Sequence, residues 1–150
     1  MGNICRSPLA EGILRDKIEK AKLNWIVDSA GTAGYHIGEA PHRLSQKVAK
    51  LNGIDITHQR GRQFVKEDFE RFDFIYVMDA DNYNDVKRIA RQYWNENKID
   101  LILNMSNPNQ NLEVPDPWYG TEEGYHKVFA MLSEACEAII RKYADVPISK

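Results

Sequence analysis

The residues at the start of the chain could hold a phosphate group. Residues 2–8 read GNICRSP, and Gly2 and Asn3 tolerate the left-handed backbone that turns successive N–H groups inward around an anion. Arg6 adds a planar fork of donors that fits two phosphate oxygens. Ser7 at a helix N-cap, with Pro8 at the first helical position, would aim a helix dipole at the same anion. We therefore expect a phosphate cradle here.

A second segment with chemical potential is residues 114–120, VPDPWYG. Asp116 lies between two prolines, so its backbone has little freedom and its carboxyl can be aimed at low entropy cost. Trp118 and Tyr119 could form the walls of a slot for a flat aromatic group. Taken alone, the segment is also typical of a rigid surface turn with a packed tryptophan. Its combination with the cradle favours a functional interpretation.

Composition limits the classes to which the protein can belong. The 150 residues predict one domain, and 43% hydrophobic and 28% charged residues are ordinary for a globular protein. A net charge of −2 gives no general attraction to nucleic acid or to an anionic membrane. We find no apolar run long enough to span a membrane and no signal peptide, and two distant cysteines do not make a disulfide framework. These features predict a cytoplasmic protein.

Apolar patterning predicts the elements that must position both segments. Helical spacing predicts helices near residues 9–23, 41–51, 82–94 and 121–143. Apolar runs predict strands at residues 25–27, 74–78 and 100–103, and the proline-containing stretch 104–120 predicts a loop. The alternation of strands and helices predicts an α/β fold, a three-layer sandwich with a parallel sheet. Ligands in such folds bind beyond the carboxyl ends of the strands.

The two segments together resemble the low-molecular-weight protein tyrosine phosphatase family. The opening loop resembles the family's signature loop, and residues 116–120 resemble its Asp-Pro-aromatic-aromatic-Gly loop. Residues 28–31 (DSAG) and 77–79 (VMD) resemble further family segments. By this resemblance Arg6 and Asp116 are catalytic, Ser29 steadies the phosphate loop and His58 hydrogen-bonds Asn3. The substrate-binding residues that it implies are Gly2, Asn3, Ile4, Cys5, Arg6, Ser7, Tyr35, Trp118 and Tyr119.

The resemblance implies hydrolysis of phosphotyrosine in proteins, or of small aryl phosphates, with inorganic phosphate as product. A cysteine thiolate attacks phosphorus, Asp116 protonates the leaving oxygen, and the same residue then activates water. Neither a metal nor a cofactor takes part in this mechanism. Relatives that act on phosphoarginine tend to carry threonine at the position of Ile4, so isoleucine favours phosphotyrosine.

The family's nucleophile sits six residues before its arginine, which here is one position ahead of Met1. Cys5 resembles the family's second loop cysteine, so we expect the polypeptide as written to be inactive. The family's sheet has four strands, and the first, central one would also be missing. Three outcomes stay open: a protein that begins upstream, a strand recruited by swapping or dimerisation, or remaining strands that close up in another order.

Three alternatives compete with this interpretation. One is a pseudophosphatase, a remnant that binds phosphate without hydrolysing esters. Another is an arsenate reductase of the same fold, but that chemistry needs a downstream cysteine pair and only Cys136 lies there. The third is a Mg²⁺-dependent phosphatase with an aspartyl nucleophile in Asp79-Ala80-Asp81. Against it, Asp79 or Asp81 is more simply interpreted as the N-cap of the next helix.

Overall fold

The computed structural model describes residues 5–34, 36–118 and 120–144. In order along the chain, its elements are α1 (Arg6–Lys20), α2 (Arg43–Leu51), α3 (Asp68–Arg71), β1 (Ile75–Val77), α4 (Ala80–Ala90), η1 (Arg91–Tyr93), η2 (Glu96–Lys98), β2 (Ile99–Leu101), α5 (Leu103–Ser106) and α6 (Glu122–Tyr143). Within these described ranges, no helix combines the length and the apolar character needed to cross a bilayer.

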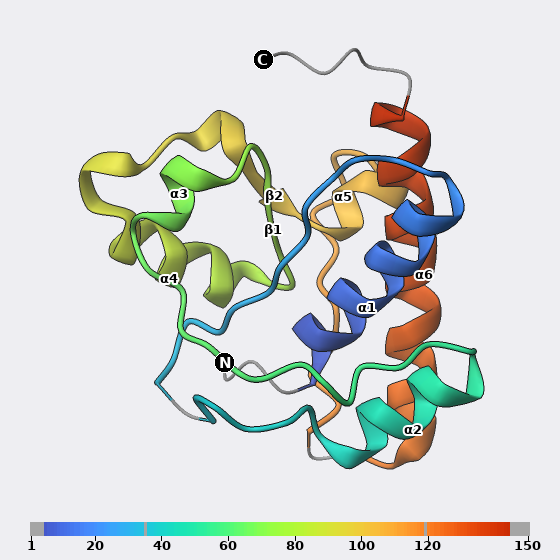
Figure 1. The fold of residues 1–150 in the computed structure, drawn as a ribbon. Helices are drawn as coiled ribbons and strands as arrows, with labels where there is room; N and C mark the ends of the chain where they lie inside the picture. Colours follow the sequence, from blue (N-terminus) through green and yellow to red (C-terminus); the bar gives the residue numbers. More distant parts are fainter. Residues whose placement is uncertain (1–4, 35, 119, 145–150) are drawn as a thin grey trace.

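The two strands form a parallel pair in the middle of the molecule. Ile75 lies opposite Ile99 and Val77 opposite Leu101. Figure 1 shows α3 and α4 on one side of this pair and α1, α5 and α6 on the other. Helix α6 packs against α1, α5 and α2. The predicted α/β class with a parallel sheet is confirmed.

Apolar side chains fill two large clusters, one on each side of the strands, and a smaller third cluster that contains Cys5, Val48 and Tyr125. The first cluster joins α1, α5 and α6 through fully buried residues such as Leu9, Ile13 and Leu132. The second joins Phe64 and Phe69 to Val86 of α4. Tyr76 packs on the first cluster and its neighbours Ile75 and Val77 on the second, as expected when successive side chains of a strand alternate between two faces. Both faces of β1 are therefore covered, which is typical of a parallel strand.

Several predicted boundaries were wrong. The predicted strand at residues 25–27 is not a strand, because no neighbouring strand in the described part of the chain forms a ladder with it. The strand predicted at 100–103 is β2, which ends at Leu101, and the loop predicted from residue 104 contains most of α5. Helix α3 was not predicted at all. Its four residues are too few to show a helical period.

The first helix also begins earlier than its apolar pattern indicated. Helix α1 starts at Arg6, and its N-cap is Cys5, which makes no side-chain capping hydrogen bond. The prediction of Ser7 as N-cap was therefore wrong, since Ser7 lies inside the first turn. The early start matters because it places Arg6 itself on a rigid helix rather than in the preceding loop.

Candidate active site

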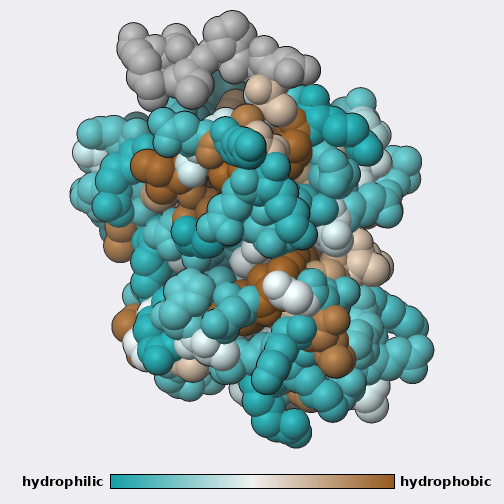
Figure 2. Space-filling model, turned by 45° about the vertical axis from the view of Figure 1, so that its right-hand side comes forward, coloured by the Kyte–Doolittle hydropathy of each residue, from teal (hydrophilic) through white to brown (hydrophobic). Residues whose placement is uncertain are grey.

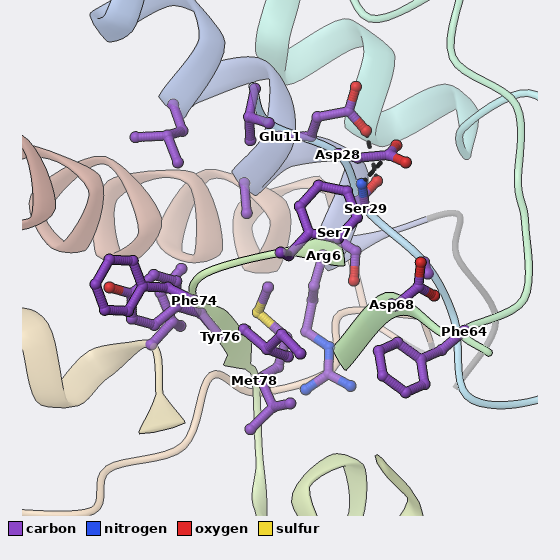
Figure 3. Close-up of a pocket in the computed structure, with 18 of the residues that line it drawn as sticks. Arg6, Ser7, Glu11, Asp28, Ser29, Phe64, Asp68, Phe74, Tyr76 and Met78 are labelled. Carbon is purple, nitrogen blue, oxygen red and sulfur yellow. Dashed lines mark hydrogen bonds between the residues drawn. The ribbon is translucent and has the colours of Figure 1, made fainter. Parts of the chain in front are cut away.

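Both chemically promising segments line one cavity of about 1420 Å³. Arg6 and Ser7 enter it from the start of α1, Asp116 and Trp118 from the loop before α6, and Ser29 from the segment after α1. Figure 3 shows Arg6 projecting between Tyr76 and Met78 on one side and Phe64 and Asp68 on the other. The cavity therefore brings together residues that lie more than a hundred positions apart in the sequence.

Arg6 is held in place by two short hydrogen bonds. Its Nη1 atom donates to Oδ2 of Asp79 at 2.8 Å and to the carbonyl oxygen of Val114 at 2.7 Å. The side chain is 6% exposed. Within residues 5–34, 36–118 and 120–144, no hydrogen bond from Nε or Nη2 is present. The guanidinium is thus fixed through one nitrogen and keeps two further donors for an anion.

Asp79 connects the sheet to the site, a role that the sequence analysis missed. It follows β1, its Oδ1 atom accepts a hydrogen bond from Asn82 N at 2.8 Å, and its Oδ2 atom accepts the bond from Arg6. The N-cap interpretation of Asp79 is confirmed. Because both carboxylate oxygens are engaged, the geometry gives no support to an aspartyl nucleophile here. The available signal was its position at the carboxyl end of a parallel strand, where ligand sites gather.

Cys5 lies beside Arg6, but its thiol is buried. Its Sγ atom is 3.8 Å from the hydroxyl oxygen of Tyr125, and its carbonyl oxygen accepts a hydrogen bond from Ser45 Oγ at 3.1 Å. Burial raises the pKa of the Cys5 thiol to about 11, although the contact with Tyr125 opposes the shift. At neutral pH the group is therefore a protonated thiol, a poor nucleophile.

Asp116 and Trp118 lie at the exposed side of the cavity. Oδ1 of Asp116 accepts a hydrogen bond from Trp118 N at 3.0 Å, which fixes the turn. The Trp118 ring lies 5.6 Å from the His36 ring and 5.2 Å from the His42 ring, measured between centroids. His42 in turn stacks on Tyr125 at 5.3 Å. Sequence reasoning did not place the two histidines near this loop, because no local pattern links them to residue 118.

The two residues predicted to support the phosphate loop, Ser29 and His58, lie in different surroundings. Ser29 Oγ donates to Glu11 Oε1 at 2.6 Å, and Glu11 also pairs with Arg15 at 2.6 Å, so Ser29 braces the first half of α1. The side chain of His58 is exposed. Its predicted partner Asn3 lies outside the described residues, as do Gly2, Ile4, Tyr35 and Tyr119.

Two further features bear on the alternatives. Cys136 in α6 is fully buried, and burial raises the pKa of its thiol to about 12, so at neutral pH it is a protonated thiol rather than a reactive thiolate. In the described part of the chain, no three His, Cys, Asp or Glu side chains are grouped closely enough to hold a metal ion.

Comparisons with known proteins agree on one family. The family model for low molecular weight phosphotyrosine protein phosphatase matches residues 1–146. The human low molecular weight phosphotyrosine protein phosphatase is 39% identical over 145 residues, which are 95% of this chain and 90% of the human protein.

Two solved structures extend the likeness to the fold. A protein tyrosine phosphatase from Entamoeba histolytica, with Hepes in its active site, superposes with a TM-score of 0.87 at 39% identity and covers 97% of this chain and 93% of its own. A Drosophila arginine phosphatase superposes with a TM-score of 0.89 at 30% identity and covers 98% and 96%.

Proposed function

Because this chain belongs to the low molecular weight phosphotyrosine protein phosphatase family, we propose that its cavity binds the phosphate of phosphotyrosine and serves its hydrolysis. The observation that carries the proposal is the placement of Arg6 and Asp116 along one cavity, with Arg6 fixed by Asp79 and Val114. Arg6 binds two phosphate oxygens through its remaining donors. Asp116 acts as general acid from the exposed side.

The proposed reaction has two steps, each with a role for these residues. A thiolate attacks phosphorus in line, an S–P bond forms, and the P–O bond to the phenol breaks as Asp116 gives its proton to the leaving oxygen. Water then attacks the cysteinyl phosphate, Asp116 takes a proton from it, and the thiolate and inorganic phosphate are released. Arg6 stabilises the charge on the equatorial oxygens in both steps.

Cys5 is not the attacking group in this proposal. Its thiol is buried and faces Tyr125, and its raised pKa keeps it protonated. The hydrolytic steps therefore need a thiolate other than that of Cys5, and the family resemblance puts it six residues before Arg6. We expect the polypeptide of the printed sequence to bind phosphate. We expect it to hydrolyse aryl phosphates about 10⁶-fold more slowly than a polypeptide that carries this thiolate.

A test compares three polypeptides with an aryl phosphate substrate. The first is the printed chain, the second adds an apolar run that ends in cysteine before Met1, and the third carries serine in place of that cysteine. We expect turnover only from the second polypeptide, and a fall of about 10²–10⁴ when it also carries Asp116→Asn. Turnover by the printed chain that disappears in Cys5→Ser would contradict the assignment of the nucleophile.

The substrate class is tested on the second polypeptide with two substrates. Trp118, held beside His36 and His42, offers an aromatic wall to a phenyl ring. Ile4 also favours phosphotyrosine over phosphoarginine by family resemblance. We expect a higher kcat/KM for a phosphotyrosine peptide than for a phosphoarginine peptide of the same sequence. A higher kcat/KM for the phosphoarginine peptide would indicate a substrate preference like that named for the Drosophila arginine phosphatase.

The state of Cys5 also supports a second candidate, a phosphate-binding protein without hydrolytic activity. Calorimetry with phosphotyrosine separates the binding function from catalysis, because binding needs no thiolate. We expect the printed chain to bind and Arg6→Lys to bind less tightly, since lysine keeps the charge but loses the two-donor fork. Equal affinity of the two proteins for phosphotyrosine would show that Arg6 does not bind the phosphate group.

A further inference from the structure

We infer that His42 is a positioning residue, which fixes the ring of Trp118 as the aromatic wall of the cavity and so favours phosphate esters of a phenol over inorganic phosphate. This inference rests on the proposed function, because it concerns the substrate of the same site. Trp118 lines the cavity together with Arg6 and Asp116. Among the described residues that line it, His36 is present and His42 is not, so His42 acts only through Trp118.

The ring of Trp118 is in contact with two histidine rings. Its centroid lies 5.2 Å from that of His42, with an angle of 73° between the ring planes, and 5.6 Å from that of His36, with an angle of 46°. Edge-to-face arrangements such as that with His42 are favoured between aromatic rings. The backbone N–H of Trp118 also donates to Oδ1 of Asp116 at 3.0 Å, so the aromatic wall is tied to the proposed general acid.

The contacts of Trp118, rather than its exposure, distinguish it from other surface residues. Its side chain is 39% exposed, but large apolar side chains reach the surface elsewhere as well. Figure 2 shows hydrophobic patches between hydrophilic side chains on one face of the molecule. Single exposed apolar side chains are ordinary in proteins. An exposed tryptophan that other rings hold in one orientation is instead suited to receive a flat group.

His42 is itself held by two contacts. Its Nδ1 atom accepts a hydrogen bond from Leu44 N at 3.1 Å at the start of α2. Its ring stacks on that of Tyr125, with 5.3 Å between the centroids and 22° between the planes, and Tyr125 is fully buried in α6. The hydroxyl oxygen of Tyr125 in turn lies 3.8 Å from Sγ of Cys5, the residue before Arg6. The ring of His42 therefore joins the aromatic wall to α2, to α6 and to the start of α1.

The helix cap alone does not explain a histidine at this position. Asparagine, aspartate, serine and threonine are the preferred N-cap residues, and each would accept a hydrogen bond at the start of α2. Histidine caps the helix with one ring nitrogen and also brings a ring into contact with both Trp118 and Tyr125. The contact with both rings is what the preferred N-cap residues cannot supply.

The support that His42 gives to Trp118 determines the size of the expected effect. A side chain that is ordered before its ligand arrives loses less conformational entropy on binding. The contact of Trp118 with His36 does not depend on the ring of His42, and His36 also pairs with Glu39 at 3.0 Å. Loss of the His42 ring should therefore loosen the wall rather than remove it.

Two substitutions separate the ring of His42 from its cap. His42→Asn keeps a side-chain acceptor for Leu44 N but removes the ring, whereas His42→Phe keeps a ring but has no acceptor. The control is His126→Asn, since His126 is exposed on α6 and pairs with Glu122. Circular dichroism checks that all three variants are folded.

Calorimetry at about pH 7.5, where an ordinary histidine ring is neutral, measures the Kd of phosphotyrosine and of inorganic phosphate for each protein. We expect His42→Asn to bind phosphotyrosine about fivefold more weakly, because the wall contacts the phenyl ring. Its affinity for inorganic phosphate should not change. We expect His42→Phe and His126→Asn to keep the ratio of the two affinities that the unmodified chain has.

A second measurement follows the ring of Trp118 without any ligand. The heteronuclear NOE of its indole N–H reports how ordered the ring is on the picosecond to nanosecond timescale, and Trp118→Phe assigns the signal. We expect a lower NOE in His42→Asn than in the unmodified chain or in His42→Phe. The indole of Trp94, which contacts Phe69 and Tyr83, is the internal reference.

Three results would overturn the inference. They are an unchanged ratio of the two affinities in His42→Asn, a Trp118 indole as ordered in His42→Asn as in the unmodified chain, and an equal loss of phosphotyrosine affinity in His42→Asn and His42→Phe. The third result would assign the effect to the cap rather than to the ring. If the unmodified chain bound neither ligand, the proposed function would be contradicted, and the indole measurement would decide by itself whether His42 fixes Trp118.

Discussion

The two ends of the large cavity are built in opposite ways. At the Arg6 end, polar groups hold one another: Nη1 of Arg6 bonds to Asp79 and Val114, and Oδ1 of Asp116 bonds to its own turn. At the other end, between β1 and residues 24–28, apolar side chains such as Leu14, Trp25 and Phe74 line the cavity. The comparison teaches that the two ends are held by different kinds of contact, hydrogen bonds at the Arg6 end and apolar packing at the other.

The two ends differ because different elements of the described chain contribute to each. The polar end draws on α1, the residue after β1 and the loop before α6, which the first apolar cluster holds together. A site whose side chains are held by neighbouring hydrogen bonds is preorganised for an anion. At the apolar end the side chains pack on one another instead: Leu14, Trp25 and Tyr76 all pack on the first apolar cluster, and the Phe74 ring lies 4.6 Å from the Tyr143 ring, measured between centroids.

The largest expected difference in the free energy of unfolding is between two variants that each shorten an apolar side chain to alanine. Leu132→Ala removes a fully buried side chain of α6 from the first cluster, and we expect it to lower the free energy of unfolding by about 4 kcal/mol. Ile26→Ala shortens a side chain that is 86% exposed at the apolar end of the cavity, and we expect the free energy of unfolding to change by less than about 0.5 kcal/mol. Urea denaturation of both variants measures the two values. A large loss from Ile26→Ala would mean that the Ile26 side chain itself is packed, and the expected contrast with Leu132 would fail.

A second test breaks the polar end. Arg6→Met leaves the carboxylate of Asp79 and the carbonyl of Val114 without their partner, and we expect a loss of about 3 kcal/mol in the free energy of unfolding. The control is Arg88→Met, since Arg88 is 70% exposed and its ion pair with Asp85 contributes little. Urea denaturation of both variants measures the two losses in the free energy of unfolding. Similar small losses in the two variants would show that Arg6 does not hold the polar end together.

The sequence predicted the parallel α/β class and the long helices, because these depend on local periodicity. Helix α6 was placed to within one residue, since its apolar side chains repeat with a clear helical period. The strand predicted at residues 25–27 failed for the opposite reason. Its apolar run satisfies a local rule, but a strand also needs a neighbour, and no local pattern states where that neighbour is.

The site was predictable only where its residues lie in recognisable segments. Arg6 and Asp116 each stand in a short motif, and they line one cavity. Their assignment as catalytic residues stays a prediction. The contact of Asp79 with Arg6, and those of His36 and His42 with Trp118, join distant parts of the chain. Such contacts follow from packing, which a single sequence does not specify.

A smaller effect sharpens the role of Asp79. Asp79→Asn keeps the side-chain oxygen that caps α4 but removes the negative charge that pairs with Arg6. We expect a loss of about 1.5 kcal/mol in the free energy of unfolding and weaker binding of inorganic phosphate, because Arg6 is less firmly oriented. The control is Asp81→Asn, since Asp81 is an exposed residue of the same helix. Unchanged phosphate affinity in Asp79→Asn would limit Asp79 to capping.

The smallest expected effect concerns pH and the histidine behind Trp118. Nδ1 of His42 accepts a hydrogen bond from Leu44 N at 3.1 Å, which caps α2, so the cap needs the neutral ring. Burial, and then the charge of Arg43, lower the pKa of His42 in the folded protein. The unfolded chain therefore takes up a proton first as pH falls through about 6.5, and the stability contributed by His42 is present above that pH and lost below it.

Replacement of His42 by asparagine isolates this contribution, because asparagine caps helices without titrating. We expect the free energy of unfolding of His42→Asn to equal that of the unmodified chain at about pH 7.5. At about pH 5 it should be higher than that of the unmodified chain by less than about 1 kcal/mol, as measured by urea denaturation. His126→Asn is the control, since His126 is exposed and pairs with Glu122 on the surface of α6. If His126→Asn shows the same pH dependence as His42→Asn, general acid titration rather than the His42 cap beside Trp118 accounts for it.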